Sequence, residues 1–242
     1  MVKRRIGYFF YNTFLALVGL FLLPIVFFRI LTSPAIWASF PQKNHLSEKP
    51  ALWIHAATEE QLAVLTDILP TLTSFFAGYQ VVLTYTGKNA VNAGKSLPPD
   101  LFFIVLPFSV ELFVRRILSR INPQLLLMIE DPFYPNLVRH CKEAGVKIAL
   151  IGGRVNHRLS LVYRLAPKFL NTIFQGIDLL MMNSVAEANR IGRKGAVLPT
   201  ILVSKAIGNQ ADGWEDAAEP DEDSLKEAVG AIGTLLGGAF EK

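Results

Sequence analysis

The feature that most constrains the fold is an alternation of short apolar runs with amphipathic segments between residues 51 and 184. Six runs have the length of strands, at 51–56, 79–86, 101–107, 125–130, 146–153 and 178–184. Helical spacing of apolar residues fills the intervals at 61–76, 109–121, 134–145 and 157–174. Continuous apolar strands that alternate with helices are typical of parallel sheets with both faces covered. The sequence therefore predicts one α/β domain with a parallel sheet.

The remaining segments differ from this body in composition. Residues 41–50 (PQKNHLSEKP) form a polar linker, and we place the globular domain at 51–204, with a last strand within 198–210. Residues 205–242 hold nine acidic residues and three lysines, which predicts an acidic linker followed by a tail helix at 225–242.

The N-terminal segment is strongly apolar. Residues 6–28 (IGYFFYNTFLALVGLFLLPIVFF) contain no charged residue, and 23 such residues can cross a hydrocarbon core of about 30 Å. The run is too long for the core of a cleaved signal peptide. We therefore expect residues 1–40 to be a membrane anchor, with 29–40 lying in the lipid interface.

The orientation of this anchor is open. The excess of positive charge in Lys3–Arg5 favours a cytoplasmic N-terminus, so a complete crossing would put the domain outside. Arg29, Lys43 and Lys49 also flank the other end of the segment. A helix that enters the bilayer without crossing it is the alternative.

The net charge of +4 conceals an asymmetry, because residues 1–204 hold 21 basic and 11 acidic residues. A basic body beside a membrane predicts anionic headgroups or phosphorylated ligands, and ordinary solvated surface charge is the alternative.

Several chemistries are excluded. A single cysteine, Cys141, excludes a disulfide framework and a cysteine zinc cluster. Gly94-Lys95-Ser96 resembles the end of a P-loop, but Asn89 stands where the first glycine is required, and there is no GxGxxG. The four histidines lack metal-ligand spacing. We therefore expect no metal, no cofactor and no nucleic-acid partner.

In a parallel sheet, ligands bind beyond the carboxyl ends of the strands, so the residues that follow each strand are site candidates. His55 ends the first strand, and Thr58, Glu60 and Gln61 follow it at the start of a helix, whose N–H groups favour anions. Glu59 and Glu60 can equally be first-turn acids that only stabilise the helix.

Two later strand ends also carry charged residues. Glu130 and Asp131 lie at the end of the fourth strand, and the alternative for Asp131 is to cap the next helix. Arg154 and Arg158 follow the fifth strand, and their guanidinium groups suit carboxylate or phosphate. A plain surface pair is the alternative for these two arginines.

These strand-end motifs resemble the N-terminal part of bacterial 3-deoxy-D-manno-octulosonic acid (Kdo) transferases. The segment 52–61 (LWIHAATEEQ) resembles the family's first motif, H-A/S-V-S-V-G-E, and 129–137 (IEDPFYPNL) resembles M-E-T-E-L-W-P-N-L. The segment 152–158 (GGRVNHR) resembles N-A-R-L-S-x-R-S, and 183–190 (NSVAEANR) resembles Q-S-E-E-D-A-x-R. A further run of the family, Y-L-P-Y-D to P-D-L-V, is similar to residues 105–126.

The resemblance implies a single Rossmann-like domain, the N-terminal half of a GT-B glycosyltransferase, carried on a membrane anchor. It implies transfer of Kdo from CMP-Kdo to a lipid A precursor at the bacterial inner membrane, with the domain on the cytoplasmic side. The acceptor and its phosphates would then meet His55, Thr58, Glu130, Asn136, Arg154 and Arg158.

The chain also departs from the family pattern. The family's catalytic base is the Glu that ends its first motif, and Gln61 takes that position here, beside Glu60. An amide cannot accept the proton, so Glu60 is the nearest candidate base. About 47 residues follow residue 195, so we expect the donor-binding domain to be missing or supplied by a separate CMP-sugar-binding partner. The alternative is a non-catalytic, membrane-tethered binding or regulatory protein.

Overall fold

The structure is a computed structural model, and it describes residues 9–14, 16–17, 20, 49–86, 97–98, 101–106, 111–131, 133–154, 157–184, 186, 188–189, 201–203 and 222–235. In this part of the chain, one parallel sheet has the strand order β3-β2-β1-β4-β5-β6-β7. The strands are β1 (Ala51–Ala56), β2 (Gln80–Tyr85), β3 (Phe102–Val105), β4 (Pro123–Ile129), β5 (Lys147–Gly153), β6 (Leu179–Met182) and β7 (Ile201–Val203). The parallel-sheet prediction is confirmed, and the strand expected within 198–210 is β7.

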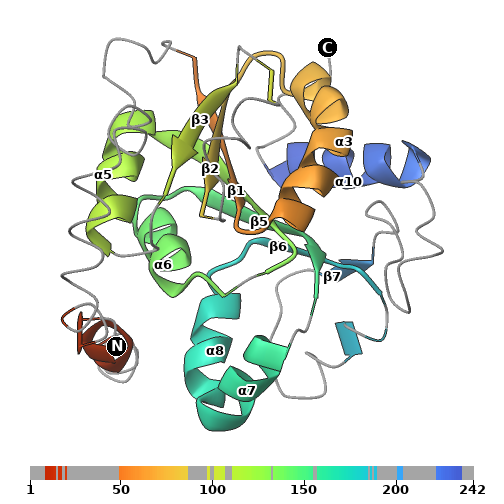
Figure 1. The fold of residues 1–242 in the computed structure, drawn as a ribbon. Helices are drawn as coiled ribbons and strands as arrows, with labels where there is room; N and C mark the ends of the chain where they lie inside the picture. Colours follow the sequence, from red (N-terminus) through yellow and green to blue (C-terminus); the bar gives the residue numbers. More distant parts are fainter. Residues whose placement is uncertain are drawn as a thin grey trace.

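Helices cover both faces of the sheet (Figure 1). The described helices are α3 (Glu59–Phe75), α5 (Glu111–Ile121), α6 (Pro135–Glu143), α7 (His157–Leu165), α8 (Pro167–Phe174) and α10 (Glu222–Leu235). The prediction of one helix over 157–174 is wrong, because α7 ends at Leu165 and α8 begins at Pro167. Proline lacks the N–H that an interior position needs, and it is favoured in the first turn of a helix.

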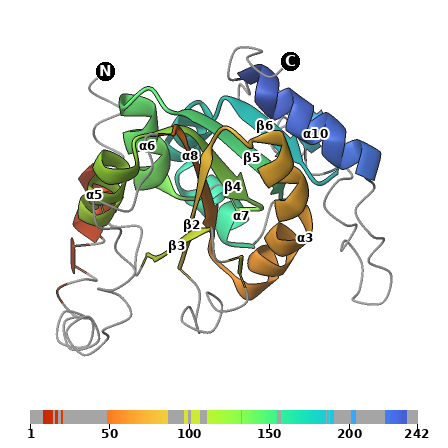
Figure 2. The same cartoon turned by 90° about the horizontal axis from the view of Figure 1, so that it is seen from above.

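Each face of the sheet has its own apolar core. Trp53 and Met128 pack with α5, α6, α7 and α8 on one face, whereas Leu52 and Ile54 pack with α3 and α10 on the other. Figure 2 shows α3 and α10 together on one side of the sheet, opposite α5 and α6. Val229 and Ile232 of α10 are fully buried. The tail helix therefore completes the core over α3.

The strand order creates a switch point between β1 and β4. The chain runs outward from β1 through β2 to β3, crosses back through α5, and then runs outward on the other side from β4 to β7. At such a point the connections leave the sheet in opposite directions, and ligands bind beyond the carboxyl ends of the two strands. The segments that follow β1 and β4 therefore define the candidate site.

The predicted anchor at 6–28 lies largely outside the described residues, as do the interfacial segment and most of the linker. Residues 9–14, 16–17 and 20 are helical. Within the described residues, we find no helix that is both long and apolar enough to span a membrane.

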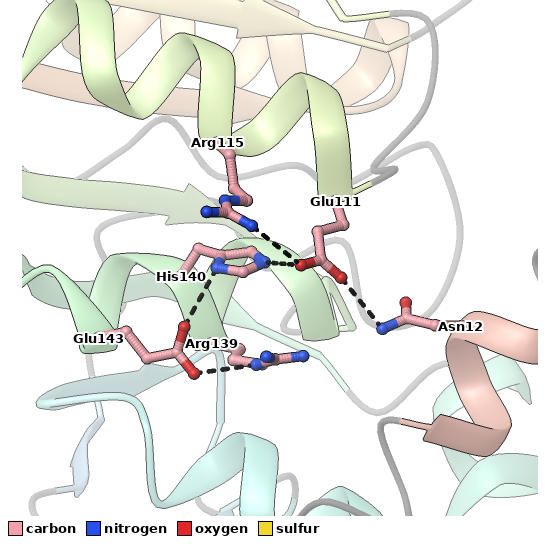
Figure 3. A network of polar contacts seen from close by, with 6 residues as sticks. All are labelled: Asn12, Glu111, Arg115, Arg139, His140 and Glu143. Carbon is pink, nitrogen blue, oxygen red and sulfur yellow. Dashed lines mark hydrogen bonds and ion pairs between the residues drawn. The ribbon is translucent and has the colours of Figure 1, made fainter.

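This N-terminal helical segment packs against the domain. The Tyr11 ring lies 5.8 Å from the ring of Phe169 and 6.3 Å from that of Phe133. Asn12 Nδ2 donates to Glu111 Oε2 at 3.3 Å, and the same carboxylate lies 3.4 Å from His140 Nε2 (Figure 3). Apolar residues elsewhere on the segment are 56–67% exposed, namely Phe9, Phe10, Phe14, Leu17 and Leu20. One side of the segment is thus docked while apolar side chains remain uncovered.

Candidate functional site

His55, the penultimate residue of β1, is almost fully buried at 1% exposure. Its Nδ1 lies 2.9 Å from Thr84 Oγ1, a hydroxyl that also accepts a hydrogen bond from Trp53 Nε1 at 2.9 Å. The ring meets Tyr134 edge-on, with 4.4 Å between the ring centroids. Burial lowers the pKa of His55 to about 3, so the imidazole is neutral at physiological pH.

The start of α3 is fixed by a reciprocal cap. Thr58 is the N-cap residue, and its Oγ1 accepts a hydrogen bond from the Gln61 amide at 3.2 Å. In return, Gln61 Oε1 accepts from the Ala57 amide at 2.7 Å. The residues T-E-E-Q thus form a variant of the capping box, and this pattern can be recognised in the sequence alone. Gln61 is buried by this arrangement.

Glu60 lies on the solvent side of the same turn. Its side chain is exposed, and a hydrogen bond from the Thr58 side chain lowers the pKa of its carboxyl group. A low pKa makes a carboxylate a weaker base. The geometry therefore matches the reading of Glu60 as a first-turn acid that stabilises α3.

Glu130 follows β4 in a left-handed backbone conformation, with φ of 60°. This region is uncommon for residues other than glycine and costs free energy, so it persists only where neighbouring contacts impose it. The Glu130 amide donates to the carbonyl of Ile151 at 2.8 Å, and its own carbonyl accepts from the Arg154 amide at 3.0 Å. Both contacts come from the end of β5.

The carboxylate of Glu130 joins three elements of the site. Its Oε1 lies 3.4 Å from Arg154 Nη2, and the Gln61 side chain, from α3, acts on it as a hydrogen-bond donor that lowers its pKa. Burial raises the pKa of Glu130, the positive charge of Arg154 opposes that rise, and the negative charges of Glu60 and Asp131 add to it. The structure thus brings together Gln61, Glu130 and Arg154 at the switch point.

Three more residues named in the sequence analysis are Asp131, Asn136 and Arg158. Asp131 Oδ1 accepts from the Phe133 amide at 2.8 Å, while the N-cap of α6 is Tyr134, so the reading of Asp131 as that cap is wrong. Asn136 is fully buried in the first turn of α6. Arg158 belongs to α7, but its side chain lies outside the part that the structure describes.

Within the part of the chain that the structure describes, three buried atoms near the strand ends have no hydrogen-bond partner: His55 Nε2, Arg154 Nε and Asn183 Oδ1. Each unpaired buried polar atom costs about 1–3 kcal/mol, and a polar ligand can remove that cost. Asn183 directly follows β6, and our sequence analysis did not select it as a site residue, although its place after a strand was the signal. Among the described residues, no cluster of His, Cys, Asp and Glu could hold a metal ion.

Comparisons with known proteins agree with the motifs at these positions. The family model of 3-deoxy-D-manno-octulosonic-acid transferase (kdotransferase) matches residues 35–207. The 3-deoxy-D-manno-octulosonic acid transferase of Chlamydia pneumoniae is 18% identical over 95% of this chain and 56% of its own length. A bifunctional glycosyltransferase/methyltransferase of Fusobacterium nucleatum is 24% identical over 64% of this chain and 24% of that protein.

Among solved structures, a UDP-N-acetylglucosamine 2-epimerase aligns with a TM-score of 0.47 and 14% identity, over 70% of this chain and 53% of that chain. The chain spans about half the length or less of the curated relatives described above. The family match covers well over half of the chain, from residue 35 to residue 207. This chain therefore belongs to the 3-deoxy-D-manno-octulosonic-acid transferase family, in its N-terminal domain.

Proposed function

We propose that this chain is the acceptor-binding half of a GT-B glycosyltransferase of lipopolysaccharide synthesis. In this proposal it holds a lipid A precursor while Kdo is transferred to it from CMP-Kdo. Family membership and the parallel sheet with a switch point support the proposal.

One observation carries it: polar groups with spare hydrogen-bonding capacity meet where β1 and β4 diverge. The Glu130 carboxylate and the Arg154 guanidinium lie side by side there, and His55 Nε2 and Arg154 Nε are buried without partners. A phosphorylated sugar presents hydroxyl groups that bind carboxylates and phosphates that bind guanidinium groups. This chemistry suits a glycolipid acceptor better than an apolar ligand.

The proposal places the chain at the bacterial inner membrane, with the domain on its cytoplasmic side. The exposed apolar side chains of the docked N-terminal segment, including Phe10 and Phe14, support contact with a bilayer. The basic residues of the body would add attraction to anionic lipid headgroups.

A second candidate function is acceptor binding without catalysis. Gln61 favours it, because the carbonyl of this side chain is held by the Ala57 amide and an amide takes up no proton. In both cases we propose that transfer requires a CMP-sugar-binding domain in addition to the acceptor-binding domain described here.

The test uses the purified full chain in detergent micelles. We expect saturable binding of a tetra-acylated lipid A precursor, weaker binding after its phosphates are removed, and no transfer of Kdo when CMP-Kdo is added. Transfer that begins only with an added CMP-sugar-binding protein would support a split enzyme. Equal binding of the precursor and of a neutral phospholipid would contradict the proposed function, and robust transfer by the chain alone would contradict the need for a partner.

A further inference from the structure

We propose that Glu130 is the group that accepts the proton of the acceptor's hydroxyl in this chain, and that Gln61 acts as a positioning residue that orients its carboxylate. This inference rests on the proposed function. It reassigns the proton acceptor from the start of α3, where the sequence placed it, to the end of β4.

The other ionisable groups near the switch point are poorly placed for this task. Glu60 is exposed and its low pKa weakens it as a base. Asp131 Oδ1 is engaged by the Phe133 amide. His55 is buried, and a pKa of about 3 makes its imidazole a weak base. Glu59, like Glu60, is exposed in the first turn of α3. Among the described carboxylates and imidazoles at these strand ends, Glu130 is the remaining group.

Two backbone hydrogen bonds fix the position of Glu130, and two side chains act on its carboxylate. Its backbone is tied to Ile151 and Arg154 by two hydrogen bonds of 2.8 and 3.0 Å, which impose the strained φ of 60°. Arg154 Nη2 lies 3.4 Å from one carboxylate oxygen. The Gln61 side chain also acts on the carboxylate as a hydrogen-bond donor, which lowers its pKa. Strain stored at a single residue in this way is typical of functional positions.

Gln61 suits the positioning role because its two polar ends have separate partners. Its carbonyl oxygen accepts from the Ala57 amide at 2.7 Å, which leaves the NH₂ group to donate to Glu130. A glutamate at position 61 would instead present a second negative charge to Glu130. Because the Gln61 amide carries no charge, it does not favour protonation of Glu130 as a second carboxylate would.

The carboxylate retains capacity for a ligand. An ionised carboxylate offers about four lone-pair positions, and Arg154 and Gln61 occupy two of them. The Glu130 side chain remains 14% exposed. Burial raises the pKa of Glu130, Arg154 opposes this rise, and the charges of Glu60 and Asp131 add to it. A raised pKa makes a carboxylate a stronger general base.

The acceptor's hydroxyl oxygen bonds to the anomeric carbon of the nucleotide-activated sugar. The bond from that carbon to the phosphate oxygen breaks, and its electron pair leaves with the nucleotide. The hydroxyl proton passes to a Glu130 oxygen and from there to water.

The test measures how the full chain binds three forms of a tetra-acylated lipid A precursor: the native hydroxyl, its methyl ether and an amine in the hydroxyl's position. A carboxylate at this point should bind the ammonium form roughly ten- to hundredfold more tightly than the ether, as a charged hydrogen bond would. The preference should decline as acid protonates Glu130. Glu130→Gln should abolish it, while Glu60→Gln, the matched control, should keep it.

An amine preference that survives in Glu130→Gln, or that is lost in Glu60→Gln as well, would overturn the inference and leave the proposed function standing. If none of the three forms binds to the wild-type chain, the proposed function itself fails and the inference falls with it. The carboxyl ¹³C signal of Glu130, titrated by NMR in the wild type and in Glu60→Gln and absent from Glu130→Gln, checks the assignment. The backbone amide spectra of both variants check that they fold.

Discussion

Glu130 and Arg154 are joined twice across the ends of β4 and β5. The Arg154 amide donates to the Glu130 carbonyl at 3.0 Å, and the Arg154 guanidinium lies 3.4 Å from the Glu130 carboxylate. The first contact belongs to the backbone and fixes where the two side chains begin. The second contact joins the oppositely charged side chains of Glu130 and Arg154, which are 14% and 30% exposed. A rigid charged pair is thus held at the switch point of the sheet.

Replacing Glu130 with glutamine should stabilise the domain at neutral pH. Because its pKa is raised in the folded state, the folded chain binds this proton more tightly than the unfolded chain does. The free energy of unfolding therefore falls as pH rises from the ordinary carboxyl pKa through the raised one. We expect Glu130→Gln to remove this fall and raise the midpoint of urea unfolding at pH 7.

The matched control is Glu60→Gln, because the pKa of Glu60 is shifted downward. This variant should not gain stability at pH 7. A destabilised Glu130→Gln with unchanged pH dependence would show that burial does not penalise the carboxylate.

The buried imidazole of His55 should make the domain sensitive to acid. Its pKa falls from 6.5 to about 3 on folding, so stability is intact above pH 6.5 and is lost as pH decreases from 6.5 toward 3. The expected slope is about 1.4 kcal/mol per pH unit from this one group.

His55→Gln should flatten the dependence in that window, measured by urea unfolding at successive pH values. His140, whose pKa is also lowered by burial, is present in both proteins, so the difference reports His55. His45→Gln, in the predicted linker, serves as the control. Parallel pH curves for the wild type and His55→Gln would disprove the assignment.

Introducing a glutamate at position 61 should weaken the domain rather than restore a base. The new carboxylate would keep the hydrogen bond from Ala57 but face Glu130 with a like charge. We expect a loss of about 0.5–3 kcal/mol at pH 7, which shrinks in acid, and no gain of Kdo transfer by the chain alone.

Gln61→Leu separates the two effects, since it removes the cap without adding charge. Its stability loss should depend less on pH in the carboxyl range than that of Gln61→Glu, because it removes one effect that lowers the Glu130 pKa but adds no negative charge. Transfer activity in Gln61→Glu alone would instead show that the amide was the missing catalytic element.

The α10 helix should behave as part of the domain core. Ile232 is fully buried against the layer that α3 also covers, so Ile232→Ala should cost about 2–5 kcal/mol. Thr234→Ala, at an exposed position of the same helix, should cost far less. Similar unfolding midpoints for Ile232→Ala and the wild type would mean that α10 does not contribute to the core.

The strands could be predicted because each is a continuous apolar run, and β1, β4 and β5 are buried along almost their whole length. The break at Ala166 was missed because apolar spacing continues across it, although Pro167 was the available signal. The packing of α10 could not be read from its sequence, since contacts with α3 depend on the order of strands in the sheet.

The candidate site, too, could be predicted from the sequence only in part. That His55 and Glu130 lie at the carboxyl ends of strands was visible in the sequence, and parallel strands bring these ends to one edge. Adjacency of β1 and β4, however, is a property of topology, and so is the contact between Gln61 and Glu130. The backbone strain at Glu130 has no sequence signature, because a glutamate is an uncommon residue at positive φ.

The most direct test of the account is an NMR titration of the full chain in micelles with a tetra-acylated lipid A precursor, following the Gln61 side-chain amide and the Glu130 carboxyl signals. We expect the Gln61 and Glu130 signals to shift saturably with the precursor and not to shift with a neutral phospholipid. Signals from α10 should stay unchanged in both titrations. Saturable shifts confined to residues away from the ends of β1 and β4 would contradict it.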